Sequence, residues 1–463
     1  MNARRFSPRT IGLLLADTAI IFGAIILALC LRLSLEGTIY QLNENNGWLK
    51  VTLATCVCLL VLYFYDLYDY TVMGNRRELL LRMIQALGIA WALLALLFYF
   101  VPPLMIGRGT SVYSVIIVLV LLLAWRVLIH LLTGHPEIGE KILIVGAGQA
   151  AIDTAEAILK RRDAGYRIVG FVTEDYESVK MKLPEARVLG TTANLEEIVH
   201  HEKIDRIVIA VRERRGAFPT EMLLRMSLAG DVSIEECTSF YERITGQVHL
   251  DMLRPSWLIF AGRGRDTRLK TVFREAVHRA LALIGLALSL PIAVITAILI
   301  KLDSKGPIFY RQERLGKNGR TFQVIKFRSM RTDAEENGKP VWATADDDRA
   351  TRIGKIIRVI RVDEIPQFWN IIKGEMSFVG PRPERPHFVS QLADEVPFYE
   401  HRHLVAPGLT GWAQIKYPYG ASVDDARQKL QFDLYYIKNQ SLALDLVLVF
   451  ETVKTVLFGR GGR

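Results

Sequence analysis

Two adjacent carboxylates, Asp363 and Glu364, stand among basic residues in the last third of the 463-residue chain. Neighbouring side chains on a helix project about 100° apart, so these two converge on one ion only at a helix start, where Pro366 would place them. The helix dipole there favours an ionised Asp363. Such a carboxylate can attack phosphorus, while Glu364, together with Asp363, can hold Mg²⁺ against a pyrophosphate. Taken alone, the pair is more commonly an acidic helix cap.

The surrounding basic residues shift the interpretation towards phosphate chemistry. A guanidinium group offers paired donors to phosphate oxygens, and the rigid sequence Gly-Pro-Arg-Pro at 380–383 is suited to fixing one such group. For Lys326 and Arg328, an anionic lipid headgroup is an equally good partner. The candidate substrate-binding residues are Arg358, Arg382, Arg385, Lys326 and Arg328.

The elements that position these groups include long apolar segments, since 51% of the residues are hydrophobic. Four runs are long enough to span a bilayer: 11–33, 51–68, 83–101 and 111–132. Basic residues cluster before the first run and between the second and third. The positive-inside rule therefore places the amino terminus and everything after residue 132 in the cytoplasm.

A fifth apolar run, 280–300, has basic residues on both sides, which favours the cytoplasm for both of its ends. Pro291 lies in its middle and disfavours a straight helix. Each half has about ten residues and a length of about 15 Å, half of a ~30 Å hydrocarbon core. We predict a re-entrant helical hairpin that breaks at Pro291; the alternative is a fifth, kinked span.

Between these membrane segments, 141–151 reads as a buried strand, a glycine turn and the start of a helix. Gly146, Gly148 and Ala151 form a GxGxxA pattern, in which the backbone can approach the pyrophosphate of a nucleotide cofactor. Room remains for about four strands but no catalytic Tyr/Lys set. A ligand-sensing site and a turn kept only for tight packing are equally good explanations.

Composition excludes several other classes of protein. The net charge of +10 comes from scattered residues, so we expect no nucleic acid partner. The four cysteines make neither a zinc spacing nor a disulfide framework. A membrane channel or sensor regulated by nucleotide binding is the main alternative, although the chain has no TVGYG-like filter. The oligomeric state stays open, with a homo-oligomer among the options.

These patterns predict a membrane protein of mixed α and α/β class with three parts. Residues 1–135 form a four-helix transmembrane domain, 136–260 a Rossmann-like parallel-sheet domain, and 261–463 a mainly helical catalytic domain that contains the re-entrant helix.

Together the motifs of 273–459 resemble the bacterial sugar transferase family, the polyprenyl-phosphate hexose-1-phosphate transferases. The preceding sequence is similar to that of large members with four spans and a Rossmann-like domain. One departure is Leu290-Pro291, where relatives often carry Ser-Pro at the bend of the re-entrant helix.

The resemblance implies that Asp363 attacks the β-phosphate of a UDP-sugar, that UMP leaves, and that undecaprenyl phosphate then takes the phosphosugar. Glu364 matches the Mg²⁺-binding partner, and Arg358 and Arg382 match phosphate or nucleotide contacts. It further implies a multi-pass protein of the bacterial inner membrane, whose catalytic and Rossmann-like domains face the cytoplasm. The product would start exopolysaccharide, capsule or O-antigen synthesis; pocket shape, and no local motif, would select the hexose.

Overall fold

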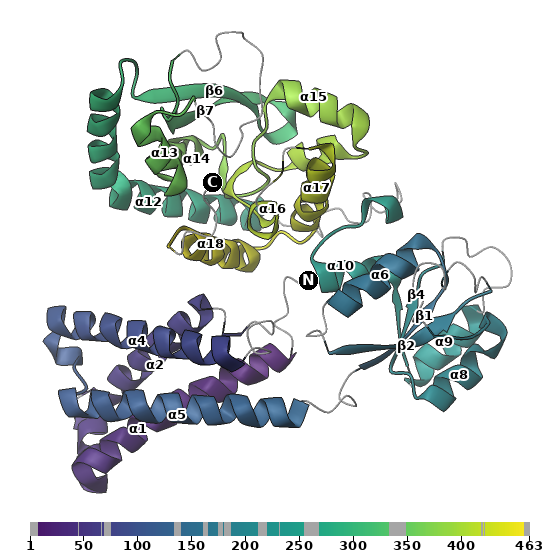
Figure 1. The fold of residues 1–463 in the computed structure, drawn as a ribbon, viewed down its shortest axis with the longest axis horizontal. Coiled ribbons are helices and arrows are strands. Elements are labelled where there is room, and N and C mark those ends of the chain that lie inside the picture. The colour runs from purple at the N-terminus through teal and green to yellow at the C-terminus, as the bar shows by residue number, and fades with distance from the viewer. Residues whose placement is uncertain are drawn as a thin grey trace.

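The computed structural model describes residues 8–44, 46–65, 67–68, 76–133, 140–160, 165–174, 179, 187–211, 220–230, 232–253, 268–332, 349–417, 420 and 422–457. The described chain forms a helical bundle, a sheet covered by helices, and a larger unit of helices with short strands (Figure 1). The predicted boundaries at 135/136 and 260/261 lie outside the described residues.

The bundle contains the four predicted apolar helices, which pack around buried side chains such as Ile25, Met83 and Leu122. The first helix continues beyond the predicted end at residue 33, with a break at Ser34, whose φ of 68° is left-handed. Among the described residues, these four helices and one in the last part of the chain are long and apolar enough to cross a membrane. The protein is therefore a membrane protein. The bundle helices are α1 (Pro8–Glu44), α2 (Gly47–Phe64), α4 (Arg76–Phe100) and α5 (Arg108–Thr133).

The middle domain is a parallel sheet of five strands in the order β3-β2-β1-β4-β5. The prediction of a parallel sheet is confirmed, and the described residues contain five strands where the sequence predicted about four. Its central strands are buried on both faces, as parallel sheets require. In chain order the elements are β1 (Glu140–Val145), α6 (Gln149–Lys160), β2 (Tyr166–Val172), β3 (Val188–Gly190), α8 (Leu195–Glu202), β4 (Arg206–Ile209), α9 (Thr220–Ala229), β5 (Ser233–Glu236) and α10 (Cys237–Thr245).

The catalytic domain consists mainly of helices around an antiparallel β6-β7 hairpin and a short parallel β8-β9 pair. Its elements are α12 (Arg268–Asp303), β6 (Phe309–Leu315), β7 (Thr321–Phe327), α13 (Arg352–Val359), η6 (Val362–Glu364), α14 (Gln367–Lys373), β8 (Ser377–Val379), α15 (Pro386–Glu395), η7 (Tyr399–Leu404), β9 (Gly408–Thr410), α16 (Trp412–Lys416), α17 (Val423–Lys438) and α18 (Leu442–Leu457).

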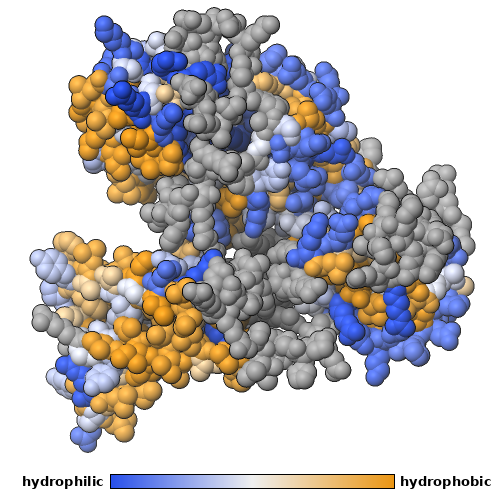
Figure 2. All heavy atoms as spheres, in the orientation of Figure 1, coloured by the Kyte–Doolittle hydropathy of each residue, from blue (hydrophilic) through white to orange (hydrophobic). Residues whose placement is uncertain are grey.

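Helix α12 contains the predicted re-entrant segment and has Pro291 inside it. Figure 1 shows two straight sections that meet at a sharp bend, as expected where proline removes a backbone donor. Both sections pack on the same domain: Ala282 lies in a core with Ile371 of α14, and Ile300 lies in one with Ile357 of α13. The rest of α12 exposes large apolar side chains, which contribute to the apolar patch over this end of the domain in Figure 2.

The segment that follows α10 joins the middle domain to the catalytic core. Val248 and Leu250 are buried among residues of α15, α16 and α17, although they precede the predicted boundary. Trp412 Nε1 donates to the Gly246 carbonyl over 2.7 Å, and Lys438 pairs with Glu242 at 2.6 Å. The segment after α10 therefore packs in the core of the unit that follows it, and two polar contacts tie the end of α10 to the same unit.

Candidate active site

Asp363 and Glu364 lie in η6, a short 3₁₀ turn between α13 and α14. The sequence predicted them in the first turn of a helix. In the structure they lie in a turn between two helices, because α13 has already ended at Val359 and α14 begins only at Gln367. Arg361 adopts a left-handed backbone with φ 55°, which redirects the chain, and Pro366 is the N-cap of α14. The two carboxylates therefore precede α14, so its dipole has less influence on them than the sequence suggested.

Asn370 fixes this turn against the β6-β7 hairpin. Its fully buried side-chain amide donates to the Gln323 carbonyl over 2.8 Å and accepts from the Ile325 amide over 3.1 Å. Because Ile325 precedes Lys326 on β7, the same contacts place the lysine beside Glu364. A buried polar group destabilises the fold unless its hydrogen bonds are all made, so these bonds favour one position of the turn relative to β7.

Three cations surround the carboxylate of Glu364. Lys326 Nζ lies 3.3 Å and Arg382 Nη2 3.2 Å from its Oε1, and Arg361 Nη1 lies 3.7 Å from its Oε2. Glu364 thus meets cations from three places in the chain: β7, the loop after β8 and the N-cap residue of η6. The structure brings together the predicted residues Lys326, Arg382, Asp363 and Glu364.

The environments of the two acids separate their pKa values. Burial raises the pKa of Asp363 to about 6, and the neighbouring Glu364 carboxylate adds to this effect, while Lys326 opposes it. For Glu364, burial acts in the same direction, but the summed attraction of Lys326, Arg382 and Arg361 is greater and lowers the pKa to about 2. Glu364 therefore stays ionised, whereas Asp363 is a basic carboxylate in a nearly water-free site, at 8% exposure.

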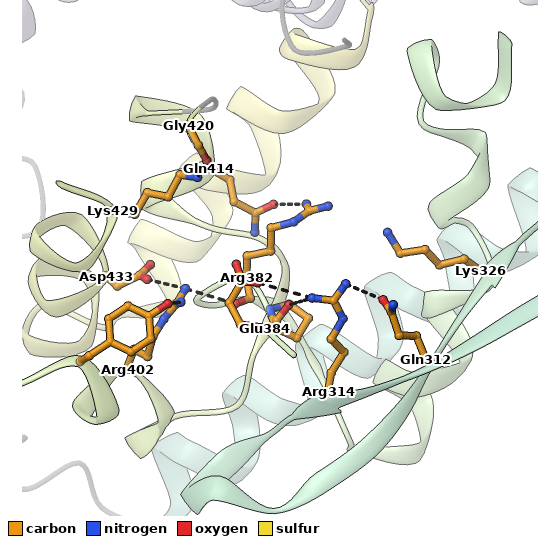
Figure 3. Close-up of polar contacts among 12 residues, drawn as sticks. Gln312, Arg314, Lys326, Arg382, Glu384, Arg402, Gln414, Gly420, Lys429 and Asp433 are labelled. Atoms are coloured by element: carbon orange, nitrogen blue, oxygen red, sulfur yellow. Dashed lines mark hydrogen bonds and ion pairs between the residues drawn. The ribbon is translucent and has the colours of Figure 1, made fainter. Parts of the chain in front are cut away.

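Arg382 is held by the tight turn that follows β8. Gly380 lies so close to the Ala406 carbonyl that a Cβ would approach it to 2.4 Å, so only glycine fits. The guanidinium bridges two elements, since Nη2 donates to Glu364 and Nη1 donates to Gln414 Oε1 over 3.1 Å. Figure 3 shows Arg382 between Lys326 on one side and Gln414 with Lys429 on the other.

A buried polar network supports the backbone of Arg382. Arg402 Nη2 donates to the Arg382 carbonyl over 3.2 Å and lies 2.9 Å from Asp433 Oδ2. Arg402 Nη1 donates to the Tyr399 hydroxyl over 2.6 Å. These contacts, drawn in Figure 3, connect η7 and α17 to the turn that carries Arg382.

Three other predicted residues lie at different places. Arg358 of α13 is close enough to lower the pKa of Asp363. Arg385 is the N-cap residue of α15, and its charge acts on Arg314. Arg328 is buried and donates to the Ser304 and Lys305 carbonyls, so these bonds hold the turn after α12. Its contact with a substrate stays a prediction.

The predicted glycine turn lies between β1 and α6. Gly146 has a φ of 122°, a conformation that favours glycine, and Ala151 is fully buried in α6. Gly148 leaves open space where a Cβ would point. Nothing in these contacts separates a ligand site from a packing turn, so the nucleotide cofactor stays a prediction.

The two adjacent carboxylates suit a divalent cation that takes most of its ligands from elsewhere. Within the part of the chain that the structure describes, no group of three His, Cys, Asp or Glu side chains could enclose a metal ion. Mg²⁺ needs no such cage, because it keeps several waters and binds one or two carboxylates together with substrate phosphates. Asp363 and Glu364 fit that role.

Several residues of the site were not predicted from the sequence. Arg361 precedes Glu364 by three positions, a spacing that could have indicated the ion pair. Gln414, Arg402, Asp433 and Lys429 gave no comparable local signal, because their partners lie many positions away.

Comparison with known proteins agrees with this geometry. The family described as bacterial sugar transferase matches residues 269–459, and one described as a CoA-binding domain matches 64–217.

Three curated relatives are similar to the chain. UDP-N-acetylgalactosamine-undecaprenyl-phosphate N-acetylgalactosaminephosphotransferase of Aeromonas hydrophila is 40% identical, with 56% of this chain and 61% of that protein aligned. Undecaprenyl-phosphate glucose phosphotransferase of Komagataeibacter xylinus is 34% identical, over 72% of this chain and 62% of that protein. Exopolysaccharide production protein PSS of Rhizobium leguminosarum bv. phaseoli is 39% identical, over 40% of this chain and 96% of that protein.

The chain spans about three fifths of the length of the first two relatives. The third is covered almost completely. The family match at 269–459 includes Asp363, Glu364 and Arg382. On this similarity the chain belongs to the bacterial sugar transferase family.

Proposed function

We propose that the protein transfers a hexose 1-phosphate from a UDP-sugar to undecaprenyl phosphate and releases UMP. The observation that carries this proposal is a buried Asp363 beside Glu364, which three cations keep ionised. The names of two relatives, which mention undecaprenyl phosphate and a sugar phosphotransferase, support it. The reaction would be the first membrane step of exopolysaccharide, capsule or O-antigen synthesis.

In the proposed mechanism, a carboxylate oxygen of Asp363 forms a bond to the β-phosphorus of the UDP-sugar. The bond from that phosphorus to the bridging oxygen breaks, and its electron pair leaves with UMP. An oxygen of undecaprenyl phosphate then attacks the same phosphorus and frees Asp363. Lys326 and Arg382, which lie 3.3 Å and 3.2 Å from Glu364, would stabilise charge on the transferring phosphoryl group.

We include Mg²⁺ in this proposal, held by Glu364 with Asp363. The ion would neutralise part of the pyrophosphate charge. Three cations, Lys326, Arg382 and Arg361, form ion pairs with Glu364. When Mg²⁺ takes their place at Glu364, they would turn towards the phosphate oxygens of the substrate. Removal of Mg²⁺ by a chelator should stop UMP release.

UMP release from a panel of UDP-hexoses tests the function and names the sugar. The purified chain, with Mg²⁺ and undecaprenyl phosphate, should release UMP over many turnovers from at least one of them. Ligand-dependent ion flux without UMP release would instead favour the channel or sensor interpretation.

The pKa of Asp363 predicts how activity depends on pH. A nucleophile must be ionised, and burial raises this pKa to about 6. Activity is therefore complete above that value and is lost as the pH falls through it. We expect kcat/KM for UMP release to decrease about tenfold per pH unit on the acid side. A rate that stays constant down to pH 4.5 would contradict this assignment.

We propose that α1, α2, α4 and α5 cross the inner membrane and that α12 enters and leaves it on the cytoplasmic side. The bend in α12 and the packing of both its sections on one domain support a re-entrant helix that breaks at Pro291. The catalytic and Rossmann-like domains then share the cytoplasm with nucleotide-activated sugars.

Single cysteines test this topology in a variant whose four native cysteines have been replaced. Met105→Cys lies between α4 and α5, and Lys317→Cys lies in the exposed turn of the β6-β7 hairpin. An impermeant maleimide should label Met105→Cys from outside the inner membrane and Lys317→Cys only after permeabilisation. Labelling of Lys317→Cys in intact spheroplasts would show that α12 crosses the membrane completely.

A further inference from the structure

Lys429 of α17 is a half-buried cation on the side of Arg382 that faces away from Lys326 (Figure 3). Its ammonium donates to the Gly420 carbonyl over 2.8 Å. Among the described residues, no carboxylate lies within ion-pair distance of it, although Glu384 and Asp425 act on it from further away. Arg382 and Arg402 also act on it, and both carry the same charge.

This arrangement is unfavourable for the isolated protein. Burial lowers the pKa of Lys429, and the repulsion from Arg382 and Arg402 adds to the shift. Asp425 is engaged elsewhere, since it accepts from Ser422 and from the Tyr417 hydroxyl in the cap of α17. Arg382 and Arg402 each have a carboxylate partner, whereas Lys429 has none at ion-pair distance among the described residues. An anion that binds beside Lys429 would supply this missing counter-ion.

Gln414 adds a neutral donor on the same side. Its Oε1 accepts from Arg382, which orients the amide, while its buried Nε2 has no hydrogen-bond partner among the residues that the structure describes. An unpaired buried donor is rare in native proteins and is satisfied by an acceptor that the ligand brings. Lys429 and Gln414 thus lie on the same side of Arg382 (Figure 3), and Arg382 itself reaches Glu364.

We propose that Lys429 and Gln414, together with Arg382, form a second phosphate subsite, which binds the phosphate of the departing nucleotide. The inference rests on the proposed function. When Asp363 attacks the β-phosphorus, the leaving phosphate departs on the opposite side of that atom, and charge develops on its oxygen. Arg382 contacts both Glu364 and Gln414, so it spans the two phosphate positions.

Equilibrium binding of UMP and of uridine to the full-length protein in nanodiscs tests the subsite, because the two ligands differ only by the phosphate. Lys429→Met should weaken UMP binding about tenfold to a hundredfold, the usual effect of losing a charge-assisted hydrogen bond, and leave uridine binding unchanged. Lys429→Arg should restore part of the loss. Lys317→Met, an exposed lysine on the β6-β7 turn, is the matched control and should bind both ligands as the wild type does.

The possible outcomes distinguish failure of the proposed subsite from failure of the proposed function. If the wild type binds UMP and Lys429→Met binds it equally well, the subsite is wrong and the proposed transfer stands. If Lys429→Met loses UMP and uridine binding together, the lysine maintains the fold of the site and is not a phosphate ligand. If the wild type binds neither UMP nor any UDP-hexose, the proposed function fails and the subsite fails with it.

Discussion

Replacing Asp363 with Asn should lower UMP release by at least about 1,000-fold, as expected when a nucleophile is removed. The amide has nearly the same shape as the carboxylate, so the contacts of the turn are preserved, but it carries no charge and does not attack phosphorus. Steady-state release of UMP from a UDP-hexose measures the effect. Asp394→Asn, an exposed carboxylate on α15, is the matched control and should keep wild-type activity.

The same variant tests the covalent intermediate when undecaprenyl phosphate is omitted. The wild type should then release about one UMP per active site and gain the mass of one hexose phosphate, which intact mass spectrometry detects. Asp363→Asn should show neither change. Turnover of Asp363→Asn within about tenfold of the wild type would remove Asp363 as the nucleophile and leave direct transfer between the two substrates.

The sequence predicted those parts of the fold that depend on local patterns. Apolar runs located the four bundle helices and α12, because length and hydrophobicity alone decide whether a helix suits a bilayer. Alternating buried strands and helices predicted the parallel sheet. The acidic pair and the Gly-Pro-Arg-Pro turn pointed to Asp363, Glu364 and Arg382, which the structure brings together, and their roles stay predictions.

Predictions were weaker where tertiary contacts decide the outcome. Helix α13 ends at Val359 and α14 begins only at Gln367. The acids therefore lie in the 3₁₀ turn after the left-handed Arg361 and not at the helix start that Pro366 suggested. Val248 and Leu250 follow the middle domain in sequence but pack in the catalytic core, because their partners come from helices that begin more than 100 residues later. Arg328 was predicted to contact a phosphate or a lipid headgroup, and no local pattern indicated that two of its nitrogens donate to the carbonyls after α12.

The Arg402–Asp433 pair shows most clearly what a local pattern cannot reveal. The two residues are 31 positions apart, and both side chains are almost completely buried. A single change, Arg402→Met or Asp433→Leu, leaves one charge in the core without its partner and should cost about 3 to 5 kcal/mol of stability. The double variant Arg402→Met/Asp433→Leu removes both charges and should recover most of that loss.

Thermal unfolding of the purified variants compares their stabilities, and UMP release measures their activity. Because Arg402 also donates to the Arg382 carbonyl, the double variant should stay less active than the wild type even where its stability recovers. Arg427→Met breaks the exposed pair with Asp251 and, as a control, should change neither quantity appreciably. A double variant as unstable as the single ones would mean that the polar contacts of Arg402 with Tyr399 and Arg382 outweigh its charge. A stable double variant with full activity would show that Arg402 maintains the fold without positioning Arg382.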